Sequence, residues 1–271
     1  MPDPLPPSLR STLVRIEPDL RVVALGRTIH SRDDVTSAEF EKRAAGSTHV
    51  GETCIGSALY RHQGLFNDAV QRPVWSHLEL SYYRDAVPAE VIAARVHARP
   101  PTGVELLRAE ILLTTPASFI LPSDWRGSGE HPERRTSIEY IHVQPPHLRQ
   151  YRDLMRELIG PAAAKLVQER KIGTFRALET AAVLYRHPSM AVDWNQIHVC
   201  EVNPQGFEGF GRLFESAFGE APRDGGLAGV FTRLDSVRTI PRWTFNDAAV
   251  EADGALAQLG SGCGPSGRSR P

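Results

Sequence analysis

Two histidines occur in the same tripeptide at two places in the chain, and their side chains are suited to acid–base chemistry. His142 lies in the segment "SIEYIHVQPP" and His198 lies in "AVDWNQIHVCEVNP". Imidazole titrates near neutral pH, so two histidines that face one ligand can act as general base and general acid. The repeated placement predicts that His142 and His198 form a catalytic pair. The alternative is two half-buried histidines that each make a structural hydrogen bond.

Four further side chains close to these histidines are predicted to contact the same ligand. Tyr140 stands two residues before His142 and shares its face of a strand, so we expect it to be a third catalytic residue. Arg176 is suited to binding a carboxylate or an enolate, and Trp194 and Asn195 are suited to the wall of a pocket. Each also has a structural alternative. Tyr140 would be a core tyrosine, Arg176 would form an ion pair at a sheet edge, and Trp194 and Asn195 would belong to a turn.

The elements that position these residues follow the order β-α-β-β-α-β. Strands are predicted where apolar residues alternate, at 137–143, 172–185, 191–202 and 236–247. Helices are predicted from Pro146 onward and from Gly206 to Phe218, because apolar residues in both recur at offsets 0, 3, 6, 7, 10 and 11. Gly160-Pro161 interrupts the first helix, which restarts at 162–171. This order is that of a ferredoxin-like α+β module.

In such a module the strands at 137–143 and 191–202 are expected to be the central, parallel pair of the sheet. The isoleucines and valines of both "IHV" tripeptides would then face the helices. His142 and His198 would share the face without helices, on strands about 4.8 Å apart. We expect that face to pack against a second sheet, with a pocket between the two.

The N-terminal half, residues 13–128, is predicted to be rich in β-strands. Strands are expected at 20–29, 52–62, 74–84, 91–99 and 104–115, and a short helix at 34–45. A polar stretch rich in turn-forming residues, 121–135, is expected to lead into the ferredoxin-like domain at 129–250. The two ends, 1–12 and 251–271, are expected to be a disordered tail and a flexible tail.

Residues 136–250 resemble the dimeric α/β-barrel superfamily, which includes antibiotic-biosynthesis-monooxygenase-like proteins, muconolactone isomerases and the NIPSNAP and EthD groups. The resemblance lies in "SIEYIHVQPPHLRQYRDLM", "GTFRALETAAVLY" and "VDWNQIHVCEV". It implies that two ferredoxin-like sheets face each other and enclose an active-site cavity. The second sheet would come either from the N-terminal half, as a diverged module of the same chain, or from the partner in a homodimer. In the latter case the N-terminal half would be a separate β-rich unit.

Composition and missing motifs argue against several other functions. The chain has 31 basic and 32 acidic residues, so no overall charge favours nucleic acid or an anionic membrane. No segment approaches the roughly 18 apolar residues of a membrane span, and no signal peptide is recognisable, so a cytoplasmic protein is expected. The three cysteines form no CxxC pair, and no dinucleotide, Walker or nucleophile-elbow motif is present. A nucleotide cofactor, a zinc ribbon and a disulfide scaffold are therefore not expected.

These observations predict a small-molecule enzyme that uses no cofactor. Its substrate would be apolar, and aromatic or polyketide-like. Acid–base steps at the histidines would drive oxygenation, isomerisation, dehydration or cyclisation. One alternative is a haem- or metal-dependent enzyme on the same scaffold, because histidines on adjacent strands can ligate a metal, although no HExxH motif is present. The other alternative is a module that binds a ligand or another subunit without catalysis.

Overall fold

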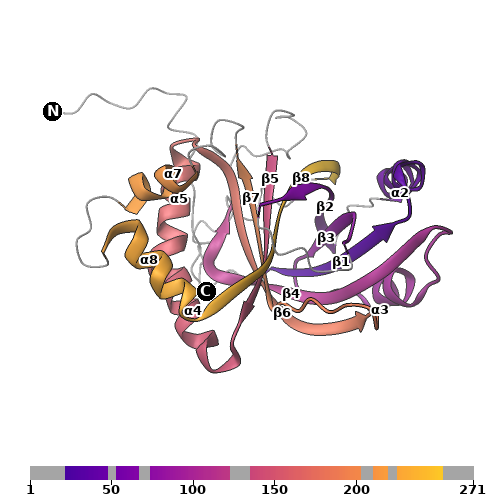
Figure 1. Ribbon diagram of the computed structural model, residues 1–271. Helices are drawn as coiled ribbons and strands as arrows, with labels where there is room; N and C mark the ends of the chain where they lie inside the picture. Colours follow the sequence, from indigo (N-terminus) through magenta and orange to yellow (C-terminus); the bar gives the residue numbers. More distant parts are fainter. Residues whose placement is uncertain are drawn as a thin grey trace, which may run out of the picture.

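Eight strands of the computed structural model form one closed antiparallel barrel (Figure 1). The structure describes residues 22–47, 53–66, 74–122, 135–202, 210–218 and 225–252. The strands are β1 (Val23–Ser31), β2 (Cys54–Leu65), β3 (His77–Tyr83), β4 (Val104–Ile120), β5 (Arg135–Val143), β6 (Ile172–Arg186), β7 (Gln196–Val202) and β8 (Arg238–Ala252). Around the barrel they follow the order β1-β3-β2-β8-β5-β7-β6-β4, and β4 closes the ring against β1.

Each half of the chain forms the same β-α-β-β-α-β module. In the first half the connections are α2 (Asp34–Ser47), and α3 (Ala89–Ile92) followed by the π-turn η1 (Ala93–His97). In the second half β5 leads into η3 (Pro145–His147), α4 (Leu148–Leu154), the π-turn η4 (Met155–Ile159) and α5 (Gly160–Gln168). The last crossover contains α7 (Phe210–Phe218) and α8 (Gly226–Asp235). The predicted α+β class with a ferredoxin-like module is confirmed, and the N-terminal half is a second such module.

Two pairs of edge strands join the modules into one barrel. β2 pairs with β8, and β4 pairs with β6, so each module covers both free edges of the other. An uncovered edge would leave a row of backbone groups without partners, which is a liability for an isolated sheet. The chain therefore supplies both sheets of its barrel. The expected homodimer stays a prediction.

One predicted strand of the N-terminal half is wrong. No strand forms at 91–99: residues 91–97 form the end of α3 and the π-turn η1. The β-branched residues favoured a strand, but Val91, Ile92 and Val96 are spaced as on one helical face, and Val96 is buried against Leu25 and Tyr83. Tertiary packing of the crossover thus outweighs β propensity. Helix α8 was not predicted, and residues 206–209 of the predicted second helix lie outside the described residues.

The central strands of the second module, β5 and β7, are antiparallel, whereas a parallel pair was expected. The first crossover returns the chain parallel to β5, but the strand it reaches is β6, at the far side of β7. The connection from β6 to β7 then reverses the chain, so β7 runs against β5. This reversal changes which residues of the two strands share a face.

The helices lie outside the barrel in two groups (Figure 1). Helices α4, α5, α7 and α8 cover the second module, and α2 and α3 lie with the first. One core fills the barrel interior and includes Tyr140, Trp194, Ile197 and Val199. A second core lies between the sheet and the helices of the second module and includes Ile141, Val143 and Cys200.

Several expectations concern residues that lie mostly outside the described ranges. These are both tails, except residues 251 and 252 at the end of β8, and residues 123–134 of the expected connection. Among the helices that the structure describes, none combines the length and the apolar character needed to span a membrane.

Gly160 marks a close approach between the helix layer and the barrel. A Cβ atom at this position would lie 2.2 Å from the carbonyl oxygen of Ala117, in an irregular part of β4 where Ala117 has a φ of 56°. Glycine is therefore required, and the preceding π-turn η4 brings it into place.

Replacing Gly160 with alanine is expected to destabilise the protein by about 1–3 kcal/mol, because a backbone carbonyl cannot rotate away as a side chain can. Elsewhere in a helix interior the same change stabilises by about 0.8–1.0 kcal/mol, so the sign of the effect is decisive. Urea unfolding of G160A and wild type measures it. A more stable variant would show that this close approach does not exist.

Candidate functional site

His198 faces the helices of the second module, not the interior of the barrel. Its Nε2 accepts a hydrogen bond from the hydroxyl of Tyr151 on α4, at 2.8 Å. Its Nδ1–H donates to the carboxylate of Glu139, directly opposite on β5, at 3.2 Å. The three side chains form a continuous hydrogen-bonded chain, Tyr151–His198–Glu139. Because Glu139 accepts at Nδ1 and Tyr151 donates at Nε2, the neutral tautomer of His198 is fixed.

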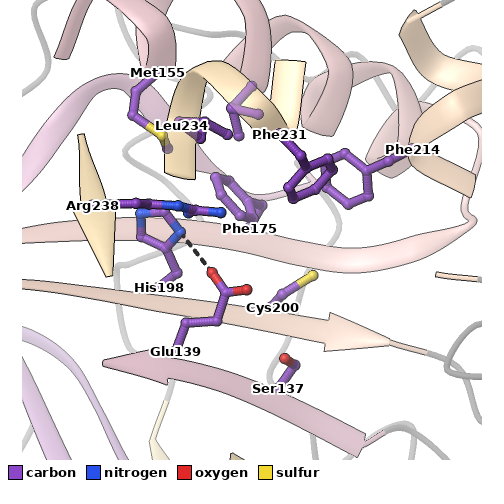
Figure 2. A pocket seen from close by; sticks show the side chains of 11 residues that line it. Ser137, Glu139, Met155, Phe175, His198, Cys200, Phe214, Phe231, Leu234 and Arg238 are labelled. Atoms are coloured by element: carbon purple, nitrogen blue, oxygen red, sulfur yellow. Dashed lines mark hydrogen bonds and ion pairs between the residues drawn. The ribbon is translucent and has the colours of Figure 1, made fainter. Parts of the chain in front are cut away.

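A cavity lies against this chain of residues, between the sheet and the helices (Figure 2). Its polar lining is Glu139, His198, Ser137, Cys200 and Arg238. The remaining walls are apolar: Met155, Ile159, Phe175, Phe214, Phe231 and Leu234. The cavity has a volume of about 440 Å³ when it is measured out to its opening. Most of this volume consists of narrow gaps between side chains, because the centre of a water molecule fits into only about 30 Å³ of it. A ligand of one aromatic ring or more therefore needs apolar side chains of the wall to rotate.

Burial is the largest influence on the titration of Glu139 and His198. It raises the pKa of Glu139, but the hydrogen bond from His198 and the charge of Arg238 outweigh it, so this pKa is below its ordinary value. Burial lowers the pKa of His198, and the contact with Glu139 offsets only part of that effect. Burial also raises the pKa of Tyr151. At neutral pH the site therefore holds an ionised Glu139, a neutral His198 and a protonated Tyr151.

The free energy of unfolding is expected to fall as the pH drops below about 6.5. In the unfolded chain His198 takes up a proton near its ordinary pKa of 6.5, whereas in the folded protein it takes it up only at lower pH. The lowered pKa of Glu139 acts in the same direction at more acidic pH. Urea unfolding of wild type and H198Q between about pH 7 and 5.5 measures the effect. Equal losses in the two proteins would show that His198 is not its source.

Comparisons with known proteins support the fold. No family profile matches the chain, and no curated protein resembles it significantly. Among solved structures, an anthrone oxidase-like protein is 12% identical with a TM-score of 0.54, over 88% of this chain and 95% of that one. A protein from Lactobacillus acidophilus NCFM, assigned by name to the monooxygenases, is 9% identical with a TM-score of 0.49, over 87% and 98%. A variant of the chlorite dismutase of Candidatus Nitrospira defluvii is 10% identical with a TM-score of 0.45, over 84% and 92%.

The chain has the dimeric α/β-barrel fold. The sheets of this α/β barrel face each other, as the resemblance implied. Here, however, His198 faces the helices, and the cavity beside it lies between the sheet and the helices. The expectation that the two histidines border a pocket between the sheets is therefore wrong.

The α/β barrel places His142 and His198 on opposite faces of the sheet, so they do not form the predicted pair. Ile141 of β5 stands opposite Gln196 of β7. Because the two strands are antiparallel, the next residue of β5, His142, comes level with position 195, which is three residues before His198. An odd offset separates side chains onto different faces, because their period along a strand is two. His142 faces away from the helices, as predicted, but His198 does not.

Tyr140 and Trp194 lie together in the interior of the barrel. The indole N–H of Trp75 donates to the hydroxyl of Tyr140 at 2.9 Å, and the rings of Tyr140 and Trp194 meet edge to face, 4.9 Å apart. The indole N–H of Trp194 donates to Glu110, and Arg108 stacks on its ring. These contacts account for both residues structurally. The catalytic role predicted for Tyr140 and the substrate-binding role predicted for Trp194 stay predictions.

Arg176 and Asn195 are likewise held by the protein itself. The guanidinium of Arg176, fully buried, binds Glu201 at 3.0 Å and donates to the hydroxyls of Tyr60 and Tyr82. The side-chain amide of Asn195 bonds both the N–H and the carbonyl of Val143, at 2.9 and 2.8 Å. Their predicted substrate contacts are not tested by this arrangement.

Three residues of the site were missed: Glu139, Tyr151 and Arg238. Glu139 stands beside Tyr140 in the sequence, and alternation alone places it on the opposite face. Tyr151 was assigned to the apolar stripe of the first predicted helix, and Arg238 to the last strand. A correct register for β5 and β7 would have paired Glu139 with His198 and shown a carboxylate–imidazole contact.

The residues around His198 do not fit a haem or a metal ion. Both ring nitrogens of His198 are engaged, by Glu139 and Tyr151, so neither is free to ligate iron or another metal. Within the described part of the chain, no group of three or more His, Cys, Asp or Glu side chains has the geometry of a metal site.

Proposed function

We propose that this chain is an enzyme that removes a proton from a small, largely apolar carbon acid in the cavity beneath the helices. The observation that carries the proposal is the hydrogen-bonded chain Tyr151–His198–Glu139, which ends on a carboxylate at the cavity wall. The side chain of Glu139 is 16% exposed although one of its oxygens is bound to His198. It can therefore still accept a proton from a ligand.

Glu139 is the general base of the proposal. A carboxylate shielded by apolar walls is poorly hydrated, so little solvent must be displaced when a C–H bond reaches it. His198 is a positioning residue, because its Nδ1–H fixes the carboxylate, and Tyr151 in turn fixes the tautomer of His198. The predicted catalytic roles of His142 and Tyr140 stay predictions and take no part in this step.

The reaction classes follow from the fate of the carbanion. Glu139 takes the proton and the substrate keeps the electron pair as an enolate. Return of the proton to another carbon gives isomerisation, and its transfer to a departing hydroxyl gives dehydration. Attack of the enolate on dioxygen gives oxygenation, and an anthrone would in this way yield a quinone and one water. Anthrone enters the proposal because an anthrone oxidase-like protein shares the fold.

The proposal is tested by the exchange of acidic C–H protons with deuterated water. The purified protein is incubated with carbon acids of increasing size, from one-ring aryl ketones to anthrone. Proton NMR follows the exchange, and an oxygen electrode follows oxygen consumption. Exchange faster than in buffer alone, for at least one compound, is expected. Binding without faster exchange across the whole series would contradict the proposal and favour a module that binds a ligand without catalysis.

A further inference from the structure

Among the described residues that line the cavity, Arg238 is the one cation. It is 6% exposed, and its buried Nε–H has no hydrogen-bond partner within the described structure. The carboxylate of Asp235 is 3.5 Å from Nε, but Asp235 is 64% exposed and its contact is too long for a good hydrogen bond. A buried N–H without a partner is costly. Arg238 is therefore suited to a ligand that supplies an acceptor.

The surroundings of Arg238 are apolar apart from the catalytic chain. The side chain lies beside His198 in the cavity (Figure 2), and its guanidinium is 6.0 Å from the centre of the Phe231 ring. The titratable and charged groups near it come from β5, β7, α4 and α8: Glu139, His198, Cys200, Tyr151 and Asp235. Of the described lining residues, only Glu139 carries a negative charge, so one anion and one cation face the ligand.

We infer that Arg238 binds the oxygen of a phenol or enol as an oxyanion, so that the ligands of this cavity are small aromatic phenols and enols. The guanidinium offers a planar set of N–H donors to that oxygen, and the aromatic walls receive the ring. At neutral pH the phenolic proton leaves to the solvent, because the pKa of Glu139 lies below its ordinary value, and the guanidinium of Arg238 offsets the charge of the oxyanion. A phenol can enter the cavity as a neutral molecule, whereas a carboxylate is already an anion when it enters and so meets repulsion from Glu139. This inference rests on the cavity of the proposed function and names its ligand class.

The test uses 4-nitrophenol, whose phenolate absorbs at a longer wavelength than the phenol. Absorbance is titrated against pH with and without saturating protein, for wild type, R238M, R238K and E139Q. R233M removes an exposed arginine of α8 and is the matched control. Neutral 4-nitroanisole reports whether each variant still binds an aromatic ring, and 4-nitrobenzoate tests a carboxylate.

In wild type and R233M the bound probe is expected to ionise about one pH unit lower than in R238M, a tenfold preference for phenolate. R238K should retain part of the shift, and E139Q should increase it, because a negative charge is removed. An unchanged shift in R238M that still binds 4-nitroanisole would overturn the inference. If R238M does not fold, two results together would overturn the inference. Bound 4-nitrophenol would ionise at the same pH in R238K and wild type, and 4-nitrobenzoate would bind more tightly than 4-nitrophenol.

The two proposals fail separately. E139Q loses the base but keeps Arg238, so it should bind nitrophenolate while losing exchange activity. If the protein catalyses carbon-acid exchange but the ionisation of bound 4-nitrophenol does not depend on Arg238, the proposed function stands and the inference about the ligand is wrong. If that ionisation depends on Arg238 but no carbon acid exchanges, the inference about the ligand stands and the proposed function is wrong.

Discussion

Replacing Glu139 with glutamine is expected to lower the rate of carbon-acid exchange by at least about 100-fold. Glutamine keeps the size of the side chain and can still bond to His198, but it cannot take up a proton. The measurement is the NMR exchange rate with the fastest compound of the series, compared for wild type and E139Q. A near-normal rate in E139Q would show that another group is the base.

The matched control is Glu157→Gln. Glu157 lies exposed on the π-turn η4 and undergoes the same change of charge outside the cavity. The exchange rate of E157Q should equal that of wild type. Urea unfolding of both variants separates a chemical effect from a loss of folded protein, because only the rate per folded molecule tests the role of Glu139.

Replacing Arg176 with methionine is expected to destabilise the barrel by about 3–5 kcal/mol. Arg176 and Glu201 are both completely buried, and their side chains are paired at 3.0 Å. Removal of the guanidinium leaves the charge of Glu201 inside the barrel without its partner. It also removes the bonds to Tyr60 and Tyr82, which come from the first module, so the contact between the modules is weakened as well.

The free energy of unfolding in urea measures this effect. Arg186→Met changes an exposed arginine on the same strand and should alter stability by no more than about 0.5 kcal/mol. The double variant R176M/E201L should be more stable than R176M alone, because no unpaired charge remains. A stable R176M with weakened ligand binding would instead support the substrate contact predicted from the sequence.

Much of the fold was accessible from the sequence. The alternation in "SIEYIHV" predicted β5, and the two equally spaced apolar stripes predicted helices after β5 and β7. Their order predicted a ferredoxin-like module, which the structure confirms. The first half was predicted to be β-rich, either a diverged second module or a separate unit, and the choice stayed open because the segment at 91–99 has a β-branched composition but packs as a helical crossover.

The candidate site was only partly accessible. His198 was identified from its residue type and its repeated tripeptide, and it does line the cavity. The equivalent position of the other tripeptide, His142, faces the opposite side of the sheet. Arg176 was singled out for its charge, but the buried partner Glu201 lies on another strand, and no local pattern links the two.

The sequence by itself determined most of the strands and helices, because hydrophobic period and turn residues are local properties, but the crossover of α3 and η1 took its form from tertiary packing. Only the tertiary structure decided which residues meet. Side chains alternate along each strand, so the register between antiparallel β5 and β7 decides whether His198 lies beside His142 or beside Glu139. That register depends on the crossover geometry and on helix packing across the whole module. It places His198 against Glu139, under α4 and next to Arg238.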